Sequence, residues 1–162
     1  MSENYGTKIE RKMLAHYINV SKPDAVWERL GKDLEEFNVE LNAEAEDKKN
    51  ILGETNVIIS SYAPTSSAEP YYARKGTKLF EWLQEAIDER KVLDDLQVET
   101  LEVHTWDGEE TANTAFKEIA YVEPTSYGGD STGYQLPFKL HYTGERVKGK
   151  FDLTTKKFTA AA

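Results

Sequence analysis

The sequence predicts a mainly β fold: a β-sandwich or half-barrel with one flanking α-helix and a long charged β-hairpin loop. Three observations lead to this prediction. Short segments with apolar residues at every second position recur along the chain between turn residues, which is typical of strands. A single segment has helical periodicity. A charged, proline-free stretch separates two of the strand patterns at residues 43–55. We expect one domain over residues 1–162, with flexible ends at 1–10 and 159–162.

Alternation or a continuous apolar run indicates each strand in turn. In chain order, strands are expected over residues 12–20, 25–30, 36–42, 56–64, 98–105, 116–122, 136–142 and 147–153, with a short last strand near Phe158. Residues rich in Gly, Pro, Asp, Ser and Thr separate them and favour turns or loops. Such connections are expected over residues 21–24, 65–70, 107–110, 124–133 and 143–146.

One helix is expected over residues 77–90. Its apolar residues recur three and four positions apart, so they form one stripe, and acidic residues occupy the opposite side. Thr77 can cap the first turn through its hydroxyl group. The helix is therefore expected to cover an open face of the sheet, and its packing face consists of Leu79, Phe80, Leu83 and Ile87.

The charged segment 43–55 is the most unusual part of the chain. Most β-hairpin loops have two to five residues, and longer ones are often functional or disordered. This segment contains Ile51 and Leu52, whose side chains would gain from burial. We interpret it as a loop that becomes ordered when it meets a neighbouring subunit. The expected interface residues are Glu44, Glu46, Asp47, Lys48, Lys49, Asn50, Ile51 and Leu52.

Composition restricts the classes of function. The chain has 20 Lys and Arg against 29 Asp and Glu, a net charge of −9. Such a chain is poorly suited to grip nucleic acid, which requires phosphate neutralisation, although the same charge can repel nucleic acid or simply provide solubility. The absence of cysteine excludes disulfides, thiol catalysis and cysteine-ligated metals. No apolar run has the length of a membrane helix, and the first residues lack the apolar region of a signal peptide.

A search for catalytic or metal-binding motifs finds no candidate. His16, His104 and His141 lie on separate predicted strands without ligand spacing, so we expect ordinary strand positions and no metal site. The glycine-rich segment 128–133 lacks the Gly-Lys-Ser/Thr that completes a phosphate-binding loop. We therefore expect no catalytic residues and no cofactor, and a structural or binding protein in place of an enzyme.

Several short segments, in their order along the chain, resemble the corresponding segments of a known protein family. They are residues 30–34 leading to 39–42, the charged segment returning through 50–54 to 60–64, one helix after 70–72, and finally 126–130 and 142–152. In this order the chain resembles the major tail tube proteins of long-tailed, siphovirus-type bacteriophages and prophages of Gram-positive bacteria. The resemblance covers nearly the whole chain and rests on order and spacing, since no single motif is diagnostic.

The resemblance implies hexameric rings that stack into a tube, with the charged loop reaching the next ring. A barrel of about 24 strands, roughly 4.8 Å apart and tilted by about 40°, would leave a bore of roughly 35–40 Å. DNA would pass through this lumen during ejection without specific binding. The implied partners are further copies of the chain and tape-measure and tail-terminator proteins. The implied location is the virion tail, after assembly in the host bacterial cytoplasm, with no membrane involved.

Three alternatives remain open from the sequence. The chain can be a monomeric β-sandwich module that binds carbohydrate or another ligand through loop tyrosines and Trp106. It can be a small β-barrel enzyme or ligand carrier, which would require a deep pocket with convergent polar groups. It can also form the inner tube of a contractile tail or a phage-derived bacteriocin, which uses a similar subunit.

Overall fold

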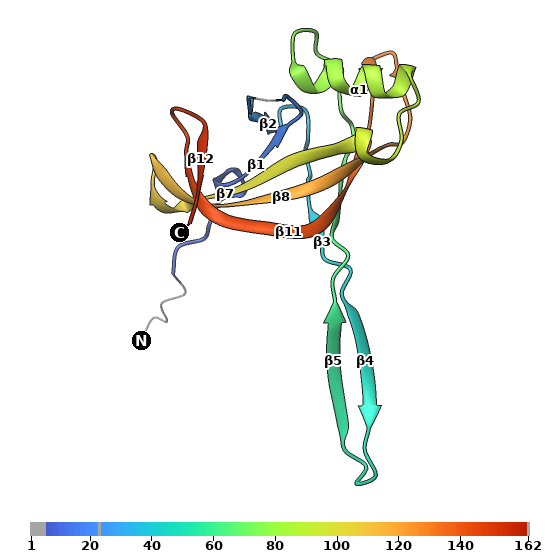
Figure 1. Ribbon diagram of the computed structural model, residues 1–162, viewed down its shortest axis with the longest axis vertical. Coiled ribbons are helices and arrows are strands. Elements are labelled where there is room, and N and C mark those ends of the chain that lie inside the picture. The colour runs from blue at the N-terminus through green and yellow to red at the C-terminus, as the bar shows by residue number, and fades with distance from the viewer. Residues whose placement is uncertain (1–5, 23, 162) are drawn as a thin grey trace.

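The structure is a computed structural model that describes residues 6–22 and 24–161. Its body is one curved antiparallel sheet of eight strands, in which β7, β8 and β11 form a bent central layer (Figure 1). The order is β2-β1-β7-β8-β11-β6-β3, and β12 pairs with β11 beside this path. The strands are β1 Leu14–Asn19, β2 Glu28–Leu30, β3 Val39–Glu40, β6 Thr65–Ala68, β7 Gln97–Glu109, β8 Ala112–Pro124, β11 Phe138–Asp152 and β12 Lys157–Ala160. The predicted mainly β fold with one flanking helix is confirmed.

The helix α1 (Lys78–Asp88) lies over one face of the sheet (Figure 1). The hydroxyl group of Thr77 accepts a hydrogen bond from the Phe80 amide, as expected for a helix cap. The carboxylate of Glu28 also accepts from the Lys78 amide at 2.6 Å, so it satisfies a further free N–H of the first turn. Two short 3-10 helices, η1 (Arg11–Met13) and η2 (Leu93–Leu96), complete the helical structure of the described residues.

The larger hydrophobic core lies between α1 and the sheet. Three of the four residues expected on the helix packing face are buried in it, and Phe80 packs against it half-buried. The buried members of this cluster are Ile18, Phe37, Ala68, Leu79, Leu83, Ile87, Val98, Ala120, Val122, Leu136, Phe138 and Leu140. The helix is therefore fixed to the sheet by its apolar stripe.

A second core lies on the opposite face of the sheet. Tyr17 and Leu101 are paired across β1 and β7, and their sequence neighbours Ile18 and Thr100 point to the other side because strand residues alternate. The buried members are Ala15, Tyr17, Trp27, Leu101, Val103, Ala115 and Phe151. Phe158 of β12 packs against this cluster, so the last strand helps to cover it. The predicted flexible end at 159–162 overlaps β12, in which Thr159 and Ala160 pair with β11.

Two segments expected as loops or turns are strands, and a third, residues 107–110, lies mostly in β7, which continues to Glu109. Residues 65–68 form β6, and the hydroxyl groups of Ser66 and Tyr142 are hydrogen-bonded at 3.0 Å, which allows a serine to be buried there. Residues 143–146 do not turn the chain, because β11 continues through them with a bulge opposite β8. Gly144 has φ +87° at this bulge, a conformation that glycine adopts without strain.

The charged segment is also a strand where the sequence predicted a loop. Residues 44–49 form β4 (Glu44–Lys49), which pairs along its length with β5 (Thr55–Ser61). Residues 50–54 alone make the connection. A separate short hairpin, β9 (Gly128–Asp130) with β10 (Gly133–Gln135), occupies part of the expected loop 124–133.

Candidate assembly surfaces

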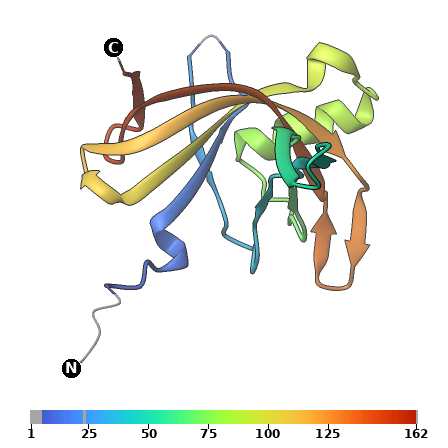
Figure 2. The ribbon, with the colours of Figure 1, turned by 90° about the horizontal axis from the view of Figure 1, so that it is seen from below.

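The β4–β5 hairpin, called the arm below, projects from the body as an isolated two-stranded ribbon (Figure 1). Figure 2 looks along it and shows the sheet arched beside its root. Every residue of β4 and β5 is exposed. Two strands without a supporting layer are marginally stable in water. In a monomer, the arm therefore has no second layer of the described structure packed against it to stabilise it.

The tip of the arm has a defined turn. The side-chain oxygen of Asn50 accepts hydrogen bonds from the amides of Leu52 at 2.9 Å and Glu54 at 3.0 Å. Gly53 has φ +80°, which suits the reversal of the chain. The turn holds Ile51 and Leu52 in solvent with 103% and 77% of their surface exposed. The two residues predicted as apolar anchors thus stand at the far end of the arm.

Both sides of the arm mix apolar and charged side chains. Ala45 is paired with Ile59 and Asp47 with Val57, and paired residues lie on the same side of a ribbon. Val57 and Ile59 are exposed on this side beside Asp47 and Lys49, and the exposed Ile58 lies on the other side with Glu46. The acidic residues of β4, Glu44, Glu46 and Asp47, gather toward the root, whereas Lys48 and Lys49 lie toward the tip.

Hydrogen bonds join the two strands of the chain at the root of the arm. The amide of Ala63 donates to the Leu41 carbonyl at 3.1 Å. The side-chain amide of Asn42 donates to the Ala63 carbonyl at 3.0 Å and to the Thr65 hydroxyl at 3.1 Å. Asn42 has φ +48°, a left-handed conformation that asparagine tolerates. These bonds fix the direction in which the arm leaves the body.

A groove lies beside this root, between the sheet and the segment that leads into β3. It consists of two adjoining hollows that share Arg11, Leu14, His16 and Phe37. One side is apolar and includes the exposed Leu41 and Tyr62. The other side carries four basic residues, Arg11, Lys12, Arg29 and Lys32, with Glu35 as the one carboxylate in that hollow. We call the whole surface the basic groove. The sequence did not point to it because its residues come from separate segments.

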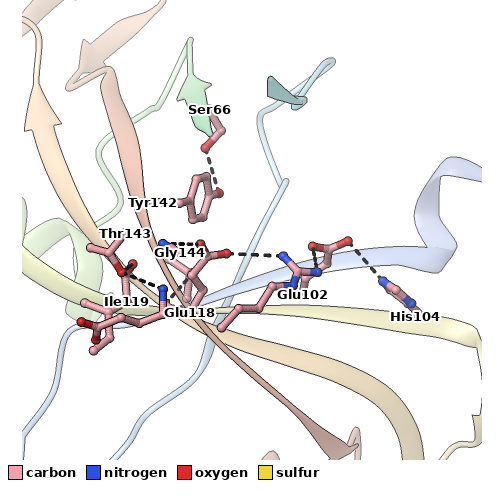
Figure 3. Close-up of polar contacts among 11 residues, drawn as sticks. Ser66, Glu102, His104, Glu118, Ile119, Tyr142, Thr143 and Gly144 are labelled. Atoms are coloured by element: carbon pink, nitrogen blue, oxygen red, sulfur yellow. Dashed lines mark hydrogen bonds and ion pairs between the residues drawn. The ribbon is translucent and has the colours of Figure 1, made fainter. Parts of the chain in front are cut away.

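A charged network forms the floor of the groove where β7, β8 and β11 meet (Figure 3). The guanidinium of Arg146 donates to Glu102 at 3.0 Å and to the buried Glu118 at 3.4 Å, and it lies over the ring of Phe116. The Gly144 amide donates to Glu118 at 3.0 Å. Burial raises the pKa of Glu102, but hydrogen bonds with His104 and Arg146 outweigh it and lower that pKa below its usual value. The network holds the bulge of β11 in place.

His16 lies in the wall of the groove with its ring against Phe37. Burial lowers the pKa of His16 to about 4, and the charges of Arg11 and Arg29 act in the same direction, against the carboxylate of Glu102. The folded chain therefore holds the imidazole of His16 in its neutral form near pH 7. The three histidines do not form one cluster: His104 stacks on Trp106 and is close enough for its charge to lower the pKa of His16, whereas His141 faces Glu123 on β8.

The shifted pKa of His16 predicts a loss of stability in acid. The unfolded chain takes up a proton near pH 6.5, whereas the folded chain resists protonation until about pH 4. The free energy of unfolding should therefore fall as the pH drops from 6.5 to 4, by about 3 kcal/mol, with no further loss from this group below that range. Urea denaturation at pH 7 and at pH 4 measures the change. His16→Leu should remove this part of the pH dependence, whereas the exposed-site control His141→Gln should retain it. An unchanged acid loss in His16→Leu would show the assignment to be wrong.

The face of the sheet away from α1 is polar along β8, β11 and β6. Its residues alternate with the core residues Val122 and Leu140, so they point to the opposite side. This open polar face includes Glu40, Thr65, Ser67, Glu99, Lys117, Tyr121, Glu123, Lys139 and His141. Lys117 pairs with Glu99 at 3.3 Å, and the other charges are largely exposed to solvent.

In residues 6–22 and 24–161, no group of three or more His, Cys, Asp or Glu side chains is arranged to hold a metal ion. None of the helices in the same part of the chain is long and apolar enough to cross a membrane. What the described residues do offer is an uncovered arm, a basic groove and an open polar face.

Comparison with known proteins finds relatives in structure alone. No protein-family model matches the sequence, and no curated protein matches it either. Among solved structures, the SPP1 tail tube, determined by solid-state NMR and cryo-EM, aligns with a TM-score of 0.58 and 16% identity over 90% of this chain and 81% of that chain. The PVC sheath/tube terminator of an extracellular contractile injection system, in the extended state, aligns with a TM-score of 0.50 and 10% identity over 90% of this chain and 99% of that chain. At these identities the likeness shows a shared fold.

Proposed function

We propose that this chain is a structural subunit of a tail tube, in which six copies form a ring and the rings stack into a conduit for DNA. The observation that carries this proposal is the arm, whose residues are all exposed and whose tip presents Ile51 and Leu52 to solvent. A ribbon of this kind fits a chain whose working state is an assembly. The shared fold with the SPP1 tail tube supports the same function.

The open polar face is the surface we assign to the lumen. Because α1 covers the other side of the sheet, this is the face that can line a water-filled channel. It carries the carboxylates of Glu40, Glu99 and Glu123 beside Lys117 and Lys139. With few basic groups to neutralise phosphates, such a wall lets DNA slide without specific binding. The free edges of β2 and β3 would pair with neighbouring subunits, which closes the barrel and removes exposed strand edges.

The proposed setting follows from the same assignment. The subunit would belong to the virion tail of a long-tailed phage or prophage with a Gram-positive host, and it would assemble in the bacterial cytoplasm. Its partners would be further copies, a tape-measure protein and a tail-terminator protein, and it would not act as an enzyme. The shared fold with the tube terminator of a contractile injection system favours one second candidate, the inner tube of a contractile machine.

Electron microscopy of the purified chain tests the proposal. Concentrated protein, incubated for several days, is expected to form rings or hollow tubes with a bore of roughly 35–40 Å, wide enough for duplex DNA. Light scattering should show the same growth in particle size. A protein that stays monomeric at high concentration, with or without added tube fragments as seeds, would contradict the proposal. A specific hit on a glycan array would then favour a carbohydrate-binding module.

A further inference from the structure

The basic groove changes in character from one end to the other. Its two hollows have volumes of about 500 and 830 Å³, and they share lining residues, so they form one continuous depression. The first hollow carries the basic residues, whereas the walls of the second are largely apolar. Hollows of this size are typical of sites for small molecules. The groove therefore offers a cationic end and an apolar end within one ligand-sized space.

The cationic end is held in place by the backbone. The guanidinium of Arg11 donates to the carbonyls of Leu14 at 2.8 Å and Phe37 at 2.7 Å. The guanidinium of Arg29 donates to the carbonyl of Lys12 at 2.8 Å. A guanidinium has five N–H donors, so each of these two groups retains donors for a ligand. Their positions are thus fixed before a ligand arrives, which lowers the entropic cost of binding.

The charge at this end is not neutralised internally. Over residues 6–22 and 24–161, neither Arg11 nor Arg29 forms an ion pair, although Glu35 lines the same hollow. Acidic residues outnumber basic ones by 29 to 20 in this chain, so two guanidinium groups without a carboxylate partner are unusual. The charges of both act on the buried ring of His16, which places the two groups near each other. Guanidinium groups arranged in this way are suited to a carboxylate, which they bind through paired hydrogen bonds.

The apolar end is suited to a hydrocarbon chain. Leu41 and Tyr62 line its wall and are exposed to solvent, so a chain laid on them would remove apolar surface from water. The floor carries two carboxylates, Glu102 and Glu118, against the single guanidinium of Arg146 (Figure 3). This floor is unfavourable to a further anion. A ligand with one acidic group is therefore oriented, with that group at the cationic end.

We propose that the basic groove binds a small amphipathic acid, with its carboxylate at Arg11 and Arg29 and its hydrocarbon chain along the apolar wall. This binding activity goes beyond the proposed tube function, since all of its residues belong to one subunit. Because the ligand would bind the folded chain, it should also stabilise the free subunit against unfolding.

Isothermal titration calorimetry of dilute protein with decanoate tests the site. The titration is done at about pH 8, at which the carboxyl group of the ligand is ionised, and below the concentration at which it forms micelles. One decanoate should bind per chain. Octanoate should bind more weakly and dodecanoate more tightly, by about threefold for each CH₂ group. Decanol has the same chain without the charge, and its affinity should be about tenfold lower than that of decanoate.

Substitution at the cationic end should affect the acid alone. Arg29→Gln with Lys32→Gln should weaken decanoate binding by about tenfold and leave decanol binding unchanged. Arg11 is retained in this variant because its hydrogen bonds to two carbonyls support the fold. Lys75→Gln with Lys78→Gln makes the same change in charge outside the groove, ahead of and at the start of α1, and should leave both affinities unchanged.

Substitution at the apolar end should affect both ligands. Leu41→Ser with Tyr62→Ser should weaken decanoate and decanol alike, and urea denaturation shows that each variant is folded. Failure of the folded wild-type chain to bind decanoate in a saturable manner would overturn the proposal. Equal decanoate affinities of wild type and the Arg29 and Lys32 variant would do the same, since they would indicate nonspecific apolar adsorption. Both outcomes leave the tube function standing, because the titration uses dilute protein before any assembly.

Discussion

Removal of the arm should leave a folded monomer that no longer forms tubes. The variant deletes residues 43–62 and joins Asn42 to Ala63 through one inserted glycine. The existing hydrogen bond from the Ala63 amide to the Leu41 carbonyl then closes a two-residue Asn-Gly turn, and Asn42 already has the positive φ that this turn needs. Because every deleted strand residue is exposed, the core should be unaffected.

The measurements separate folding from assembly. Urea denaturation of the deletion variant should give a free energy of unfolding within about 1 kcal/mol of wild type, since surface changes rarely cost more. Electron microscopy should show no tubes at concentrations at which wild type forms them.

The double variant Ile51→Ser with Leu52→Ser tests the tip alone, and we expect it to weaken assembly strongly. Val92→Ser with Leu93→Ser removes another exposed apolar pair away from the arm and serves as the control. If the variant that lacks residues 43–62 formed tubes at the wild-type concentration, the arm would have no part in assembly.

The sequence predicted those elements whose signal is local. The period of the helix, its Thr77 cap and its apolar stripe can all be read within fifteen residues, and the structure places α1 accordingly. The start of β11 has a local signal as well, because its buried and exposed residues alternate along the strand. β1 is recognised differently: five of its six residues are buried, on both faces of the sheet, so it appears in the sequence as a continuous apolar run.

The elements that escaped prediction depend on distant partners. β4 is exposed on both sides, so its residues follow no alternation, and its strand is defined by pairing with β5. Residues 143–146 read as a turn, but Glu118, more than twenty residues away, accepts from Gly144 and Arg146 and holds them as a bulge inside β11. Ser66 is buried because its hydroxyl meets that of Tyr142. None of these partners can be identified from neighbouring residues.

The candidate surfaces also differ in whether a local sequence signal marks them. Ile51 and Leu52 could be named from the sequence because two large apolar residues in a charged segment are conspicuous. The basic groove could not, since Arg11, Arg29 and Leu41 meet through the pairing of β1 with β2 and through the path of the chain into β3. A surface assembled from several segments leaves no motif in any of them.

A substitution in the packing face of the helix should have the largest effect on stability. Leu83 has 0% of its surface exposed and lies in the core between α1 and the sheet. Leu83→Ala would remove three buried carbon atoms and leave a cavity, which lowers the free energy of unfolding by about 3 kcal/mol in comparable cores. Urea denaturation should show the loss as a lower midpoint with an unchanged slope. Glu81→Ala, on the exposed side of the same helix, should change stability by less than about 0.5 kcal/mol.

This comparison decides what the apolar stripe of α1 is for. If Leu83→Ala produces the expected loss, the stripe is bound to the sheet in the free subunit, and assembly must use other surfaces such as the arm. If Leu83→Ala unfolds like wild type, the helix does not belong to the cooperative core, and its apolar side would be available to a neighbouring copy. Because Leu79 and Ile87 flank Leu83 in the same cluster, Leu79→Ala should act in the same direction and provides an independent check.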